Sequence, residues 1–283
     1  MKRYSKKQKW LFGILIFVLL FATATTIANE IAANRGQELP GYEKKDIEGT
    51  VEKLSQGQTL TKKESTFLYE QTGLGEDAFM ALADRGEASE LLKYQDALFQ
   101  KSTYSTISTN FFTGEEALND EAKDLLPFAD LQDGDVLVTA AAHTLGWQHG
   151  HCGLIVDAEE GKILEAFTIG QPSEICSLDK WLRYPNVIQL RPKSKDRNSD
   201  IGTLAANYGK ANLNHIPYSL FSDLQDDESD ITKTHCAHLI RMSYLPYGIE
   251  LKEGLIVTPK DIANSDDFYV VQVRGMDPTK LWE

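Results

Sequence analysis

The fold of this chain of 283 residues is decided by one stretch near its middle, His149-Gly150-His151-Cys152-Gly153-Leu154-Ile155-Val156. Its apolar run behind a glycine is typical of a buried strand with a histidine at its entrance. Similar short β-type runs, separated by turn residues, are found at 136–138, 163–167, 187–190 and 269–273, and helical spacing is found at 201–208 and 236–244. Strands that follow one another in the chain, with helices toward its end, predict an α+β domain around a central antiparallel sheet.

A second segment, about eighty residues later, opens a predicted helix: Thr234-His235-Cys236-Ala237-His238-Leu239-Ile240-Arg241. Cys236 falls in the first turn, where the positive end of the helix dipole favours thiolate over thiol. A histidine carried on a strand, such as His151, is the usual kind of partner for this nucleophile. The two segments together predict a cysteine hydrolase in which the histidine precedes the cysteine along the chain.

Glu165 is the candidate for the group that orients His151 and stabilises its protonated form. Residues 157–162 supply a turn, and Glu165 on the returning strand shares the face of His151 if the hairpin register is even. A simple tight hairpin would set Glu165 opposite Ile155, so strand twist or a bulge must close the gap. His149, on the same face as His151, stays open as an alternative base.

In their order along the chain, several motifs resemble those of the circularly permuted, YiiX-like branch of the NlpC-type papain-fold hydrolases. The resemblance extends over residues 131–275, and the motifs are Asp133-Gly134-Asp135-Val136-Leu137, His151-Cys152-Gly153-Leu154-Ile155, Ile163-Leu164-Glu165-Ala166, Ile216-Pro217-Tyr218-Ser219-Leu220-Phe221, His235-Cys236-Ala237-His238-Leu239-Ile240 and Val257-Thr258-Pro259-Lys260-Asp261-Ile262. The branch more often has Ser-Glu where this chain has Ala237-His238, and an aliphatic residue at Cys152.

The resemblance implies a permuted papain-like domain with Cys236 as nucleophile, His151 as base and Glu165 as the orienting residue. It also implies Tyr218 as a site residue that aids oxyanion or substrate binding. Members of the superfamily cleave amide bonds in bacterial cell-wall peptides, and permuted relatives include lipid acyltransferases. We therefore expect a peptidoglycan amide as substrate, with a lipid ester or amide as the alternative and with no cofactor.

The N-terminus predicts export. Residues 1–9 contain five basic and no acidic residues, and residues 10–28 are uncharged over about the length of a membrane-spanning helix. The basic flank predicts a cytoplasmic N-terminus, and hence a cell-membrane protein with an extracellular catalytic domain. A cleavable signal peptide, ending near Ala22-Thr23-Ala24, is the alternative and would make the protein secreted.

Between the N-terminal segment and the catalytic domain we expect a polar tether at 29–45 and a helical region at 46–127. In that region, Thr61-Lys62-Lys63-Glu64 is a capping box, Gly73 a helix stop, and Glu87 the start of a further helix. The Ser- and Thr-rich residues 102–113 predict a linker, and residues 128–283 form the hydrolase domain. The net charge of −13 argues against a nucleic-acid partner.

A non-catalytic interpretation uses the same residues. The nitrogen and sulfur ligands that zinc prefers are gathered in the set His149, His151, Cys152, His235, Cys236 and His238, although their spacing matches no standard structural zinc pattern. A module that only binds wall peptides is a further alternative. Three cysteines leave one unpaired, so we expect Cys152 and Cys176 to be buried apolar residues, or a disulfide between them.

Overall fold

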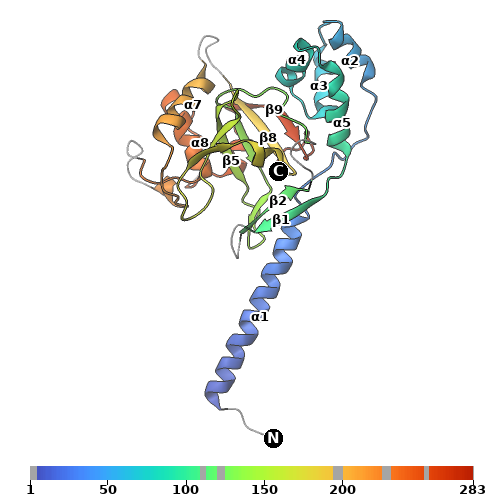
Figure 1. Cartoon of the computed structure of the whole chain (residues 1–283). Helices are drawn as coiled ribbons and strands as arrows, with labels where there is room; N and C mark the ends of the chain where they lie inside the picture. The colour runs from blue at the N-terminus through green and yellow to red at the C-terminus, as the bar shows by residue number, and fades with distance from the viewer. Residues whose placement is uncertain are drawn as a thin grey trace.

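The computed structural model describes residues 5–108, 113–119, 125–193, 200–224, 231–251 and 255–282. The chain is α+β, with two antiparallel sheets (Figure 1). The larger sheet has the strand order β7-β6-β5-β3-β8-β9, made of Val136–Thr139 (β3), His151–Asp157 (β5), Lys162–Glu165 (β6), Glu174–Ser177 (β7), Val187–Pro192 (β8) and Phe268–Arg274 (β9). Every strand predicted from the sequence in this domain is therefore present.

The larger sheet is covered by helices on one face. Helices Ile201–Asn212 (α7) and Cys236–Tyr244 (α8) pack against β5, in a core that includes Leu154 and Ile240. Because side chains alternate along a strand, Ile155 points to the opposite face. There it packs with Trp181, which comes from the short helix Asp179–Leu182 (α6). A further short helix, Pro259–Ala263 (α9), precedes the last strand.

The predicted helical region packs beside β9 (Figure 1). It consists of Glu48–Ser55 (α2), Lys62–Thr72 (α3), Glu76–Asp84 (α4), the 3₁₀ turn Ala88–Glu90 and Leu91–Phe99 (α5). The capping box is confirmed, since the Thr61 hydroxyl accepts from the Glu64 amide and the Glu64 carboxylate accepts from the Thr61 amide. Gly73 ends the helix with a φ of 72°, which an L-residue adopts only with strain.

The linker predicted at 102–113 is wrong where the structure describes it. Tyr104–Ser108 forms strand β1, which pairs antiparallel with Thr113–Leu118 (β2), and β2 pairs in turn with Ala142–Thr144 (β4). Residues 109–112 lie outside the described residues. Threonine, tyrosine and isoleucine fit a pleated sheet surface, and their tertiary pairing outweighs the loop tendency of the serines among them.

Helix α1 spans Lys6–Ala33 and extends away from the rest of the molecule (Figure 1). It starts at a capping box between Ser5 and Gln8, and it continues through residues 29–33, where we expected the tether to begin. Within the described residues it is the one helix long and apolar enough to cross a membrane, a test that a signal sequence also passes. Its most apolar window is not buried by the protein.

Candidate active site

Cys236 is the first residue of α8. His235 is its N-cap in extended conformation, and the Nδ1 atom of His235 accepts a hydrogen bond from the amide of His238 at 3.4 Å. The first N–H groups of a helix have no intrahelical acceptor, so those next to Cys236 can donate hydrogen bonds to a group that lies beside the thiol. The sequence thus places a thiol at the positive end of a helix dipole, as predicted.

His151 and Glu165 are brought together by a β-bulge. The β5–β6 register pairs Ile155 with Ile163, and a shift between Ile155 and Asp157 moves Glu165 closer to His151 than a simple hairpin would. The Nε2 atom of His151 lies 2.8 Å from Oε2 of Glu165, and both side chains are buried. This contact uses Nε2 and leaves Nδ1 of His151 for a second partner, and the charge of the nearby Cys236 acts on the imidazole.

Trp181 completes the support of this pair. Its indole N–H donates to Oε2 of Glu165 at 3.1 Å, and its ring stacks on the His151 ring with 5.4 Å between centroids. Gly153 makes room for it, because a Cβ at position 153 would lie 3.2 Å from the Trp181 ring and 2.7 Å from Ile163. Trp181 was not predicted as a site residue, although the glycine in an otherwise apolar strand indicates such a close approach.

The charges of the site favour a thiolate–imidazolium pair. Burial alone lowers the pKa of His151, but hydrogen bonds to Cys236 and Glu165 outweigh it and raise the pKa to about 9. Burial likewise opposes ionisation of Glu165, yet the bond to His151 lowers its pKa to about 2. A hydrogen bond from Cys152 lowers the pKa of Cys236 well below its usual value against the effect of burial, and His151 and His235 lower it further.

A second histidine–carboxylate pair lies beside the thiol. Nε2 of His235 is 2.7 Å from Oδ2 of Asp223, which also accepts from the amide of Val257 at 3.2 Å. Burial lowers the pKa of His235, but the bonds to Asp223 and Cys236 raise it to about 9. Asp223 belongs to the 3₁₀ turn Ser222–Leu224. It was not predicted as a site residue because no recognisable motif surrounds it in the sequence. Only its pairing in space relates it to the site.

A small cavity of about 30 Å³ opens on the thiol. It is lined by Thr113, Glu115, Ala142, His149, Gly150, His151, Phe167, Thr168, Tyr218 and Cys236. Since His151 lines this cavity and His235 does not, His151 is the histidine that would contact a molecule entering the cavity. Tyr218, predicted as a site residue, is half-buried, and burial and the nearby charge of Cys236 raise the pKa of its hydroxyl. Tyr218 therefore remains a hydrogen-bond donor at neutral pH.

His149, the alternative base, is differently placed. Its Nδ1 donates to the carbonyl of Gly150 at 2.8 Å, and its Nε2 accepts from the hydroxyl of Thr144 at 2.9 Å. Burial lowers its pKa, and no carboxylate of the described residues forms a hydrogen bond or an ion pair with the ring. These contacts describe a neutral ring in the wall of the cavity, with both nitrogens engaged.

All three cysteines are free thiols. Cys152 is buried, as expected, whereas Cys176 is partly exposed and its thiol lies 3.4 Å from Oε1 of Glu165. Burial raises the pKa of Cys176 to about 12, with the charge of Glu165 adding to the effect. In the described part of the chain, which contains all six proposed zinc ligands, no three His, Cys, Asp or Glu residues are arranged to hold a metal ion.

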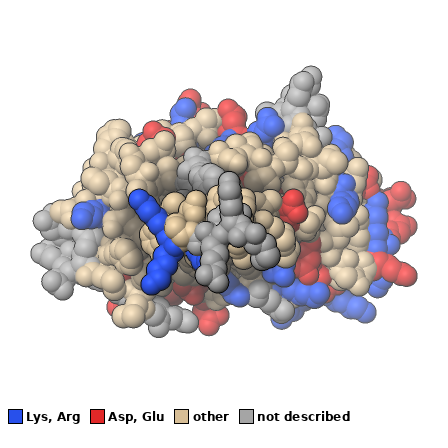
Figure 2. Space-filling model, turned by 90° about the horizontal axis from the view of Figure 1, so that it is seen from below, with Lys and Arg blue, Asp and Glu red and all other residues tan. Residues whose placement is uncertain are grey.

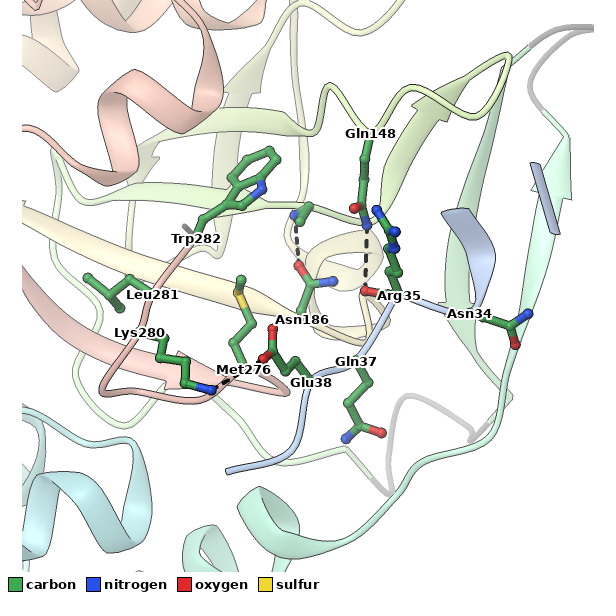
Figure 3. Close-up of a pocket in the computed structure, with 11 residues that line it drawn as sticks. Asn34, Arg35, Gln37, Glu38, Gln148, Asn186, Met276, Lys280, Leu281 and Trp282 are labelled. Atoms are coloured by element: carbon green, nitrogen blue, oxygen red, sulfur yellow. Dashed lines mark hydrogen bonds and ion pairs between the residues drawn. The ribbon is translucent and has the colours of Figure 1, made fainter. Parts of the chain in front are cut away.

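A larger cavity, of about 410 Å³, lies where the chain leaves α1 and meets the C-terminal segment (Figure 3). Its lining includes Arg35, Asn186, Met276, Lys280 and Trp282, but neither a cysteine nor a histidine. Despite its size it has no nucleophile paired with a base. The smaller cavity at Cys236 is therefore the candidate active site.

Comparison with known proteins identifies no relative: no protein-family model, no curated protein and no solved structure matches the chain.

Proposed function

We propose that this protein is a membrane-anchored cysteine hydrolase that cleaves an acyl bond through a thioester on Cys236. The observation that carries the proposal is the convergence of a helix-terminal thiol, His151 and Glu165 beside one cavity. A structural cysteine in an apolar site has its pKa raised, whereas a nucleophile needs the opposite shift. Cys152 and Cys236 show these two cases side by side.

In the mechanism, the Cys236 thiolate attacks the acyl carbon and forms a tetrahedral intermediate. The N–H groups at the start of α8 and the Tyr218 hydroxyl are available as donors to the oxyanion. Protonated His151 then gives its proton to the leaving amine or alcohol, and the intermediate collapses to the thioester. Neutral His151 next takes a proton from water, the resulting hydroxide attacks the thioester, and the acid departs as the thiolate is regenerated. Glu165 holds the imidazole throughout.

The domain arrangement agrees with the permuted papain-like fold that the sequence resembles. An antiparallel sheet supplies the histidine and the acid first, and a later helix supplies the cysteine. This order is what the permutation requires. The fold assignment remains part of the proposal.

For the substrate we propose the amide bond of a peptidoglycan stem peptide outside the cell membrane, with α1 as the anchor. The lining of the cavity, with an acidic Glu115 and the aromatic rings of Phe167 and Tyr218, suits a polar peptide more than a long acyl chain. A lipid ester or amide is the second candidate, and the membrane helix itself favours it.

The test is the alkylation rate of each cysteine by iodoacetamide against pH, measured by mass spectrometry on the full chain in detergent. We expect fast labelling of Cys236 at pH 6, with little increase up to pH 8, because its lowered pKa keeps the thiolate populated. Cys152 and Cys176 are internal controls, since their raised pKa values predict slow labelling that increases with pH.

A rate for Cys236 that follows an ordinary thiol, with a midpoint near pH 8.5, would contradict the proposal. The variant His151→Ala should slow the labelling of Cys236 at pH 6 by removing its partner. Acceleration of labelling by a chelator would instead support the zinc-binding alternative.

A further inference from the structure

The end of helix α1 is fixed to the catalytic domain. Oδ1 of Asn29 accepts from the amide of Gly146 at 2.8 Å, and a Cβ at Gly146 would lie 2.4 Å from the Cβ of Ala28. Beyond the helix, the Gly36 carbonyl accepts from the Asn186 side chain at 2.6 Å and the Glu38 amide donates to Gly275 at 3.0 Å. Figure 3 shows this segment passing between Gln148 and the C-terminal residues. The domain therefore has a defined position relative to α1.

The contact at Gly146 lies at the end of the apolar part of the helix. Residues 10–28 are uncharged, and Glu30 is the first charged residue after them. At about 1.5 Å per residue this stretch is roughly 28 Å long, close to the ~30 Å hydrocarbon thickness of a bilayer. With α1 spanning the membrane, Ala28 and the Gly146 that touches it lie at the outer boundary of the hydrocarbon.

Gly146 belongs to a tight hairpin turn, residues 144–147, which we call the interfacial hairpin. Thr144 and Trp147 exchange two backbone hydrogen bonds of 2.9 Å, and the φ angles of Leu145 and Gly146 are 52° and 80°. Glycine or asparagine is the favoured residue in such a turn, so Leu145 is held there with strain. Leu145 is 40% exposed and Trp147 68% exposed, which leaves two large apolar side chains at the tip.

The face of the molecule that carries α1 suits contact with a bilayer. Figure 2, which looks along α1 from its N-terminal end, shows a largely uncharged surface beside the helix, while charged side chains gather over the helical region. Tryptophan is enriched at membrane–water interfaces, where its ring lies in the headgroup layer. The Trp147 ring packs against the ring of His149 with 5.6 Å between centroids, and His149 lines the cavity of Cys236.

We propose that the interfacial hairpin inserts Leu145 and Trp147 into the headgroup region of the outer leaflet of the membrane that α1 crosses. The catalytic cavity then opens close to the lipid surface. This inference rests on the membrane anchoring proposed above and is independent of the chemistry at Cys236. The continuity of the hairpin with the end of α1 identifies the bilayer, rather than a second protein, as its partner.

The test uses full-length chain in phosphatidylcholine vesicles, made either of ordinary lipid or of lipid brominated near the carbonyl end of its acyl chains. Trp10 and Trp282 are first replaced by phenylalanine, because Trp10 lies within α1 and the partly exposed Trp282 lines the cavity where the chain leaves α1. In this Trp10→Phe/Trp282→Phe background we expect the brominated lipid to quench a large part of the tryptophan fluorescence. When Trp147→Phe is added, we expect that quenchable part to disappear, since the remaining Trp181 is fully buried in the protein.

A matched control adds Met80→Trp to the variant in which Trp10, Trp147 and Trp282 are all phenylalanine. Met80 is 40% exposed on α4, far from α1 in Figure 1, so its tryptophan should not be quenched. Equal fluorescence of the Trp10→Phe/Trp282→Phe background in the two kinds of vesicle, with the chain still in the membrane after carbonate washing, would overturn the interfacial contact alone. Release of the chain by carbonate would overturn the anchor and this inference with it, and leave the hydrolase proposal standing.

Discussion

Two buried histidine–glutamate pairs in this protein have almost the same geometry and different surroundings. His151 and Glu165 lie 2.8 Å apart in the larger sheet, and His143 and Glu116 lie 2.9 Å apart in the smaller one. All four residues are at most 5% exposed. A histidine beside a carboxylate is therefore not by itself a catalytic site in this molecule.

The difference lies in what surrounds each pair. Both oxygens of Glu165 have donors, from His151, Trp181 and Cys176, and His151 lines the same cavity as Cys236. In the described part of the chain, by contrast, Oε2 of Glu116 and Nδ1 of His143 are buried without a hydrogen-bond partner. The comparison predicts that substitutions at the first pair reduce activity, and that those at the second reduce stability.

Cys236→Ser should have the largest effect, because serine nearly preserves the shape of the side chain but is not ionised by this site. We expect turnover of an activated acyl ester to fall by at least about 10³-fold, with an unchanged melting temperature. The measurement is ester hydrolysis by the full chain in detergent, with Cys176→Ser as the matched control. Turnover retained in Cys236→Ser would contradict the thioester mechanism.

His151→Ala should reduce turnover about 10²–10⁴-fold, the usual contribution of a general acid–base group. His143→Ala should leave the turnover per folded molecule within about twofold but destabilise the protein by about 3–5 kcal/mol, because Glu116 loses its partner while it stays buried. Hydrolysis rates and chemical denaturation of both variants test this contrast.

His149→Ala provides the check on the base. A larger loss of turnover in His149→Ala than in His151→Ala would transfer the role of base to His149. If His143→Ala does not fold, Glu116→Gln gives the same comparison with a smaller change.

Glu165→Gln should be milder, with about tenfold lower turnover, because the amide can still accept a hydrogen bond from His151 but no longer stabilises its positive charge.

The same pair makes the stability of the fold depend on pH. Because the pKa of His151 is raised to about 9, protonated His151 contributes its full stabilisation below pH 6.5, and this contribution is lost as the pH rises through 9. The lowered pKa of Glu165, about 2, adds stability above pH 4.5 that is lost as the pH falls toward 2.

Removal of the Glu165 charge should therefore shift the alkaline limb of the activity profile to lower pH, and it should flatten the dependence of unfolding free energy on pH. Glu116→Gln is the matched control. If the alkaline limb of the activity profile lies at the same pH in Glu165→Gln as in the wild type, the role of Glu165 is structural.

The parts that sequence predicted are those that local patterns specify. The apolar run around Gly153 predicted β5, the capping box at Thr61 predicted α3, and apolar spacing predicted α8. Strand β1 was missed because its pairing with β2, rather than its composition, makes it a strand. The contact of His151 with Glu165 depends on a bulge. The need for it followed from the sequence, but its position between Ile155 and Asp157 did not.

The place of Asp223 beside His235 could not be predicted from the sequence. It lies twelve residues before its partner His235, across residues 225–230 that lie outside the described structure, and its role is visible only from the 2.7 Å contact. Trp181 likewise approaches the site from another element, and only Gly153 gives a hint of it.

His235→Asn should have the smallest effect of the series and tests this second pair. Asparagine is a good N-cap, so α8 and the melting temperature should be preserved while the positive imidazole beside Cys236 is lost. Because His235 contributes to the lowered pKa of Cys236, we expect several-fold lower turnover at pH 6 and recovery toward the wild-type rate at pH 9. A pH profile identical to the wild type would make His235 merely structural. A loss as large as that of His151→Ala at every pH would make it the base.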